Sequence, residues 1–521
     1  MPIPRKKEAA VHVGPVGGQA PRGLQTGSGT GRQHDAEVAC AKVRDQGTGG
    51  GHLACRDGVY QHALIVVTQM CRESRRSPAQ PLRQFLDARA PCDDSRECDG
   101  HQEYPHHRLD QERVQEQWQT RQQGDYYRGP VPVTSRRVVI TGIGMVTPLG
   151  HTFAATVEAL GRRECATATA TLFDASGFTS DAAAEVKGFD PRPYFRVPKA
   201  LKVTDRTTQF AVSAAAMALS AAGWPAGAPS GERLGVIIGT SGSDLQAHAL
   251  AGALEPGAPA ESVGDMAVFA DRMLSHLNPL WLLISLPNMP SAHVAIQLGA
   301  RGPNSTVMTD GVAGSQAIGE AADWIRGGEA DAVLAGGADT AIQPFAFAAF
   351  DQAGLLTPSA GGKAFFVPGE GAAVVLLEER EHALRRGAPI RGELCGYAAA
   401  SAPGSSIVDA FSRTISAALH ETGWQPRDVG AVGMASVAGS PLRAQEDIAL
   451  RSTLGPRATT VSQHDFQTPL GHSQGASGAI SLCLLLATAA GPGGLICNSA
   501  GYSGQSVTLC VLPAESSAQV A

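Results

Sequence analysis

The sequence contains serines next to glycines and ten cysteines, which are residue types that can act as nucleophiles or metal ligands. The segment Gly239–Ser243 lacks the Lys-Ser/Thr pair of a phosphate-binding loop, so it predicts a tight turn between a strand and a helix. Ser315 does not stand in the Gly-x-Ser-x-Gly turn that exposes a nucleophilic serine. No two cysteines form a Cys-x-x-Cys pair, so a zinc site is not supported. These residues therefore offer no ready-made phosphate, serine-nucleophile or zinc chemistry.

The elements that would position catalytic residues begin near Arg136, where strand-like and helix-like stretches start to alternate, as in an α/β domain. Val138–Ile143 is rich in β-branched residues and predicts a buried strand. Gln209–Ala222 is alanine-rich and apolar on nearly all sides, as expected of a helix packed between layers. Gly235–Gly239 predicts a second buried strand.

Two parts of this region share one order of elements, about 200 residues apart. One predicted helix ends at Gly223 and another at Gly423, and each is followed by a tryptophan and then by a strand. Segments 305–309 and 459–463 are also predicted strands, and each leads through a loop into a helix of small residues. The pattern predicts two similar halves that share a core.

The composition excludes several classes of protein. The chain has 521 residues, 43% of them hydrophobic and 17% charged, which rules out collagen, coiled coil and wholesale disorder. A net charge of −6 without a basic stripe predicts no nucleic-acid partner. The longest apolar stretch, Ala479–Ala490, is too short to span a bilayer, so we expect no membrane association. We expect a cytoplasmic protein that uses neither a metal nor a cofactor.

Residues 1–134 differ in texture, being rich in Gly, Gln, Arg and His. Only Ala63–Met70 resembles a buried element, and one such run cannot offset the ordering entropy of the rest, which predicts a largely disordered, low-complexity extension. Its first residues lack the apolar core of a secretory signal. The alternative hypothesis is that this stretch is mis-assigned and that synthesis begins near Val131 or Val133.

Several longer segments resemble the signatures of a known family. Over nearly all of residues 136–514 the sequence resembles the β-ketoacyl synthases, which have the thiolase fold. The resemblance implies an α/β fold with αβαβα layers and two pseudo-repeated halves, residues 136–385 and 386–514. The matching segments are RRVVITGIGMVTPLG (136–150), DRTTQFAVSAAAMAL (205–219), GSQAIGEAADWIRGGEADAVLAGGAD (314–339) and NSAGYSG (498–504).

Enzymes of this family use a cysteine nucleophile at the N-terminus of a buried helix, where the helix dipole stabilises the thiolate. Two histidines stabilise the enolate that forms when a malonyl unit loses carbon dioxide. The nucleophile motif Thr-Ala-Cys-Ala-Ser-Gly corresponds to residues 309–314, and Gly311 stands where the cysteine should be. Glycine has no side chain to carry an acyl group, so we expect no covalent condensation at this position.

The remaining catalytic positions of the family are also altered. Ser436 replaces the first histidine, and Gln467 replaces the lysine of the second histidine motif, in which His472 is retained. We expect a structural, hydrogen-bonded role for this lone histidine. By resemblance, Gly501 and Tyr502 belong to the loop whose backbone N–H groups help to form an oxyanion hole.

Loss of three catalytic side chains on a retained scaffold resembles the chain-length factor, or ketosynthase β, of type II polyketide synthases. In that subfamily an acidic residue precedes a glutamine at the nucleophile position; Asp310 fits the acidic residue, whereas Gly311 departs from the glutamine. The resemblance implies an acyltransferase-family subunit that does not condense alone. It would form a heterodimer with a catalytic ketosynthase α subunit and support condensation of malonyl units carried on an acyl carrier protein.

Such a partner would pair through the strand at 304–309 and would share a tunnel that limits polyketide length. The candidate residues lie near 288–289, 310–313 and 345–350, and for each the alternative interpretation is core or interface packing. By residue they are Asn288, Met289, Asp310, Val312, Phe345 and Phe347.

Two other functions remain open on the sequence. In the first, the chain is itself an enzyme that uses Asp310 or His472 to decarboxylate or hydrolyse a bound thioester. In the second, it is a degenerate ketosynthase that acts only as a scaffold, without a tunnel of functional length.

Overall fold

The structure is a computed structural model that describes residues 136–514, except 226–230, 243–270, 273, 276, 278–279, 357–365 and 403–405. The predictions for residues 1–134, including the buried element at Ala63–Met70 and the start near Val131 or Val133, lie outside the described residues. So does Ser243, the last residue of the predicted turn.

The described residues are built around one sheet of ten strands. The first half of the chain supplies five neighbouring strands and the second half supplies the other five. In spatial order they are β10 (Ser462–His464), β9 (Val429–Gly433), β11 (Gly494–Ala500), β12 (Gln505–Pro513), β8 (Gly392–Ser401), β1 (Val138–Val146), β7 (Glu370–Glu379), β6 (Ala332–Thr340), β4 (Leu234–Gly239) and β5 (Asn304–Val307).

Each half of this sheet has the same topology. Counted along the chain within its half, the strand order is third, second, fourth, fifth, first in both halves. The halves meet where β1 and β8, the first strand of each, pair antiparallel. This common order confirms the internal repeat that the sequence predicted.

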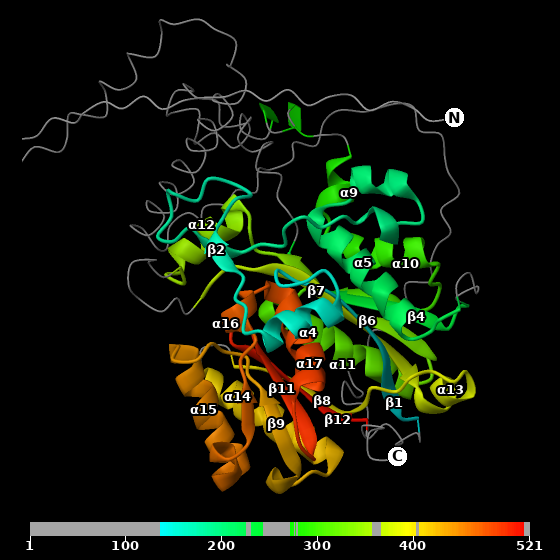
Figure 1. Ribbon diagram of the computed structural model, residues 1–521, viewed down its shortest axis with the longest axis vertical. Helices are drawn as coiled ribbons and strands as arrows, with labels where there is room; N and C mark the ends of the chain where they lie inside the picture. Colours follow the sequence, from blue (N-terminus) through cyan, green and yellow to red (C-terminus); the bar gives the residue numbers. More distant parts are fainter. Residues whose placement is uncertain are drawn as a thin grey trace, which may run out of the picture. The chain divides into compact units, whose positions relative to one another are not determined.

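Helices lie on both faces of the sheet and between its halves (Figure 1). The helices α5 (Arg206–Ala221) and α10 (Met289–Leu298) pack on the first half, and α14 (Ile407–Thr422) and α15 (Pro441–Leu454) pack on the second. The helices α11 (Ala313–Arg326) and α17 (Ser477–Thr488) share a core cluster with strands of both halves. The thiolase-like layered α/β fold is therefore confirmed.

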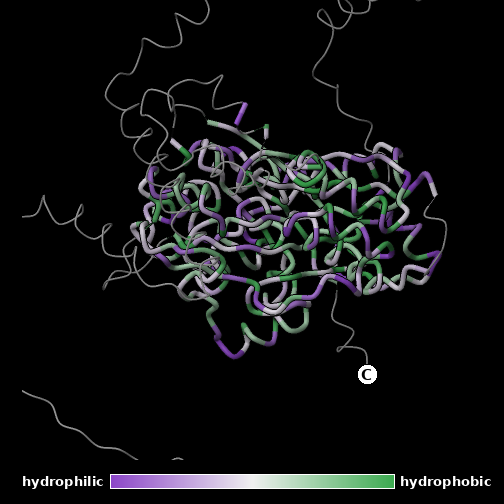
Figure 2. The backbone as a smooth tube through the Cα atoms, turned by 90° about the horizontal axis from the view of Figure 1, so that it is seen from above, coloured by the Kyte–Doolittle hydropathy of each residue, from purple (hydrophilic) through white to green (hydrophobic). Residues whose placement is uncertain are grey.

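Local sequence explains how tightly these layers pack. Asp205 caps α5 by accepting the Thr208 backbone N–H at 2.8 Å. A side chain at Gly144 of β1 would begin 1.9 Å from the Ala214 carbonyl oxygen of α5, so only glycine allows this approach of strand and helix. In Figure 2, apolar segments run through the described part of the molecule. Among the described helices, none combines the length and apolar character needed to cross a membrane.

One predicted strand is partly wrong. Segment 459–463 was expected to be extended, but β10 begins only at Ser462, because Gly455–Thr459 forms a 3₁₀ helix. A proline near its start and a closing bond from the Thr460 N–H to the Arg457 carbonyl favour that turn over a strand.

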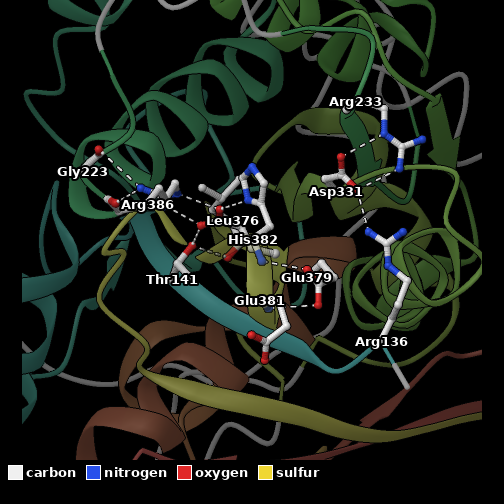
Figure 3. A network of polar contacts seen from close by, with 12 residues as sticks. Arg136, Thr141, Gly223, Arg233, Asp331, Leu376, Glu379, Glu381, His382 and Arg386 are labelled. Carbon is white, nitrogen blue, oxygen red and sulfur yellow. Dashed lines mark hydrogen bonds and ion pairs between the residues drawn. The ribbon is translucent and has the colours of Figure 1, made fainter. Parts of the chain in front are cut away.

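A buried ion-pair network ties β7 to its neighbours (Figure 3). The Glu378 side chain is fully buried and accepts hydrogen bonds from Arg386, at 2.8 Å from its Nε, and from Thr141 of β1. Arg386 also donates to the Ala222 carbonyl at the end of α5. Because the charge is paired and hydrogen-bonded, it can be accommodated inside the core.

Candidate functional site

Gly311 lies in a 3₁₀ turn, Asp310–Val312, between β5 and the central helix α11. It is buried, and a Cβ added to it would lie 2.5 Å from the Ala500 carbonyl oxygen and 3.5 Å from Cε1 of His472. The nucleophile position of the family and the retained histidine therefore face each other. However, the backbone at the end of β11 already occupies the space in which a side chain at 311 would begin.

His472 is 8% exposed and its imidazole is held by the backbone. Nδ1 accepts the Gln474 N–H at 3.2 Å, which places the ring proton on Nε2. Burial lowers the pKa of His472 to about 4, so the ring is neutral at pH 7. The Tyr502 hydroxyl lies 3.4 Å from Nδ1, and the Phe366 ring packs on the imidazole. At neutral pH His472 is not a charged acid.

Asp310 adopts a left-handed backbone conformation, with φ of +59°. Its carboxylate accepts the Tyr502 backbone N–H at 2.5 Å and also the N–H groups of Gly311 and Ser503. Burial raises the pKa of Asp310, while these hydrogen bonds oppose that rise. The Gly501 N–H donates to the Gln505 carbonyl at 3.0 Å. The loop named for an oxyanion hole thus lies beside Gly311, with its amides bound to acceptors of the same chain.

Ser436 and Gln467 belong to a separate hydrogen-bonded cluster. Ser436 Oγ donates to Glu446 at 2.5 Å, and Gln467 Nε2 donates to the Ala435 carbonyl at 2.8 Å. Glu446 also accepts the Ala435 N–H and Asn498 Nδ2, both at 3.0 Å. Burial raises the pKa of Glu446. Two replaced catalytic positions, Ser436 and Gln467, therefore take part in hydrogen bonds within the chain.

Sequence reasoning missed Glu446 and Asp339. Glu446 lies in α15, and its burial depends on tertiary contacts that include Asn498 of the strand β11. Asp339 accepts the N–H groups of Ser241 and Gly475 at 2.6 and 3.0 Å, and burial raises its pKa to about 6. A signal existed at Asp339, because a carboxylate at the end of an otherwise apolar strand needs partners.

A cavity of about 270 Å³ adjoins this site. The residues that line it include Asp310, Asp339, Phe350, Gln474 and Tyr502. The cavity is thus large enough for a small acid or an acyl group, and two acidic residues are among those that line it.

The structure separates the six tunnel or interface candidates. Of them, only Asp310 lines this cavity. Val312 and Phe347 are fully enclosed core residues, as the alternative interpretation had it, whereas Phe345 and Met289 are half-buried and Asn288 is exposed. A place for these residues along a tunnel formed with a partner stays a prediction.

The serine and glycine segments considered first have structural roles here. Ser315 Oγ lies 2.7 Å from Ser499 Oγ, and both side chains are buried. Thr240 and Gly242 form a turn at the end of β4, in which the Thr240 hydroxyl donates to the Gly242 carbonyl at 3.1 Å.

Comparison with known proteins identifies the family of the chain. Residues 135–383 match the family described as Beta-ketoacyl synthase, N-terminal domain. A 3-oxoacyl-[acyl-carrier-protein] synthase 2 from Synechocystis sp. is 32% identical over 362 residues, which cover 66% of this chain and 83% of the relative. The chain belongs to the β-ketoacyl synthase family.

Two solved structures share the fold. The ishigamide ketosynthase/chain length factor is 26% identical, with a TM-score of 0.62, and the match covers 73% of this chain and all of that one. A type II polyketide synthase acyl-carrier protein in complex with its ketosynthase gives a TM-score of 0.60 at 23% identity, over 73% of this chain and all of that one. The second likeness shows the fold alone.

Proposed function

We propose that the chain is a chain-length-factor-like subunit of a type II polyketide synthase, which pairs with a catalytic ketosynthase and does not form carbon–carbon bonds itself. The observation that carries this proposal is Gly311, because an acyl group cannot be attached there and the Ala500 carbonyl fills the space for a side chain. The partner subunit would supply the nucleophile and would take malonyl units from an acyl carrier protein.

The edge of the sheet supports pairing with a second subunit. Strand β5 has a described neighbour only on one side, β4. The Pro303 and Val307 carbonyls accept N–H groups of β4 and of the residue that follows it. The alternating residues Asn304 and Thr306 therefore direct their backbone groups to the open side. An open edge strand is a template for pairing with another chain. The similarity to a ketosynthase/chain length factor structure is consistent with such a partner.

Acylation separates this proposal from the enzyme hypothesis. The full chain is incubated with radiolabelled malonyl-acyl carrier protein, alone and with a ketosynthase encoded beside it. We expect label on the ketosynthase only, and no release of carbon dioxide by the isolated chain. Covalent label on this chain would overturn the proposal. Carbon dioxide release that is lost in His472→Ala would instead support a decarboxylase.

Pairing is tested by copurification with that ketosynthase. Thr306→Pro removes an outward backbone donor of β5 and is expected to reduce copurification at least about tenfold. The matched control is Gln463→Pro, since Gln463 lies on β10 at the other edge of the sheet and should leave copurification unchanged. Equal loss in both variants, or no loss in Thr306→Pro, would contradict pairing through β5.

Product length tests the role of the cavity in the complex. Ala346 lines it, whereas Ala349 of the same helix, α12 (Pro344–Gln352), is exposed and does not. Ala346→Leu is expected to shift the products of the paired complex to shorter chains, and Ala349→Leu should not. Unchanged products in an Ala346→Leu complex that still assembles would favour a scaffold role.

A further inference from the structure

Three backbone N–H groups converge on the Asp310 carboxylate from two segments that are far apart in the sequence. Gly311 follows Asp310 directly, whereas Tyr502 and Ser503 lie in the loop between β11 and β12. The Tyr502 N–H lies 2.5 Å from Oδ2. Converging backbone N–H groups form an anion-binding concavity, and charge-assisted hydrogen bonds to a carboxylate are strong.

Local backbone features place the carboxylate there. With φ of +59°, Asp310 is in a region that asparagine and aspartate tolerate better than most residues. A Cβ on Gly501 would lie 3.2 Å from Oδ2, so glycine lets the loop approach the carboxylate closely. Asp310 is one of the residues that line the cavity, so we expect removal of its side chain to open the N–H groups to that cavity.

We propose that the N–H groups of Gly311, Tyr502 and Ser503 form a carboxylate-binding site that this chain fills with its own Asp310. The site would take a small external carboxylate, of the class of acetate, once the resident side chain is removed. This inference goes beyond the proposed function, because it needs no partner subunit. It also implies that Asp310 keeps the carbonyl oxygen of a bound thioester away from these donors, as a second block in addition to Gly311.

The first experiment restores the missing ligand from solution. In Asp310→Gly, which suits the positive φ, acetate should raise the melting temperature of the full chain saturably, by about 2 °C or more over equal sodium chloride. Acetamide has the same shape but no charge and should have no such effect. The wild type and Asp310→Asn, in which the space stays filled, should show no rise specific to acetate.

Asp465→Ala is the matched control for loss of a carboxylate that accepts several N–H groups. Asp465 accepts those of Ala438, Gln467 and Thr468, each at 3.0 Å, but at the protein surface. Water can replace that carboxylate, so the variant should lose stability without an acetate-specific gain. Absence of the acetate effect in folded Asp310→Gly, or an equal effect in the wild type, would overturn the proposal.

A second measurement does not depend on the folding of Asp310→Gly. The chain has seven tyrosines, so ¹⁵N-tyrosine labelling gives few amide signals, and Tyr502→Phe assigns the one of interest. In the wild type the Tyr502 amide proton should resonate downfield, because it is bonded to a carboxylate. In Asp310→Asn, which keeps the size and removes the charge, it should move upfield. An unchanged shift would show that no carboxylate is bound there.

Discussion

The two halves of the molecule each contain one turn of the same design, and the turns differ in what they bind. Asp310-Gly311 precedes α11, and Gln474-Gly475 precedes α17 at the corresponding place of the repeat. Both begin with a residue of positive φ, +59° for Asp310 and +46° for Gln474. The first turn is the nucleophile position of the family, whereas the second has no assigned chemistry.

The contacts of the two glycines are nevertheless alike. A Cβ on Gly475 would lie 2.8 Å from backbone atoms of Thr240, just as one on Gly311 would lie 2.5 Å from the Ala500 carbonyl. The Gly475 N–H binds Asp339, and the Gly311 N–H binds Asp310. The position expected to hold a nucleophile therefore packs like its structural counterpart. The space that a catalytic side chain would need at position 311 is filled by the Ala500 carbonyl.

The largest effect is expected at Gly475, the glycine of the second turn. Gly475→Ala should destabilise the chain by roughly 3 kcal/mol, because three backbone atoms of residues 240 and 241 lie within 3.0 Å of the new Cβ and cannot move aside cheaply. Urea unfolding measures the loss. Gly161→Ala is the control, since nothing lies within 4 Å of its added Cβ and its stability should change by less than about 0.5 kcal/mol. Equal stability of the two variants would contradict the packing role of Gly475.

Restoring the family's cysteine tests whether Gly311 has become a packing position. Gly311→Cys should lose roughly 2 kcal/mol of stability, because its Cβ meets the Ala500 carbonyl. It should also remain unlabelled by malonyl-acyl carrier protein, since Asp310 occupies the neighbouring N–H groups. Unfolding in urea and intact mass provide the two measurements. A stable and acylated Gly311→Cys would show that the space is open.

The third prediction concerns His472, which lies between the two turns and contacts Gln474. Its pKa in the folded chain is about 4, below the ordinary value of 6.5, so the unfolded chain binds the proton more readily. Its contribution to stability is therefore present above pH 6.5 and is lost as the pH falls toward 4, by about 2 kcal/mol between pH 7 and pH 5.

Substitution of His472 measures how much of the pH dependence of stability comes from this residue. His472→Asn keeps an acceptor for the Gln474 N–H and removes the titrating group, so its stability should change less between pH 7 and pH 5 than that of the wild type. His420→Asn, at an exposed helical position, should keep the pH dependence of the wild type. Identical slopes for His472→Asn and the wild type would mean that the histidine is not buried in its neutral form.

The fold was largely predictable, because periodicity and the repeated helix–tryptophan–strand order are local properties of the sequence. The resemblance also identified Gly311 and His472 as positions of one site, and the structure brings them together. The extent of β10 was not predictable from apolar pattern alone, because the bonds of a 3₁₀ turn compete with strand formation there.

The closure of the site could not be predicted from the residues at the site. The Ala500 carbonyl and the amides of the 501–503 loop are backbone groups, which carry no side-chain signal, and they reach Gly311 only through the pairing of β11 and β12. Asp310 was recognised as an acidic residue, but the partners of its carboxylate depend on a positive φ that the sequence does not reveal. Likewise, Ser436 was read as a lost histidine, whereas its partner Glu446 depends on tertiary packing.

Ser436 gives the smallest expected effect and shows whether the second half also exchanged catalysis for packing. Ser436→Ala removes one of three donors to the buried Glu446 carboxylate and should cost roughly 1 kcal/mol, because the N–H groups from Ala435 and Asn498 remain. Urea unfolding measures this loss, with Ser412→Ala at an exposed hydroxyl pair as the control. If both variants behave alike, the Ser436 hydroxyl does not stabilise Glu446. A packing role at a former catalytic position would then be shown only at Gly311, in the first half of the molecule.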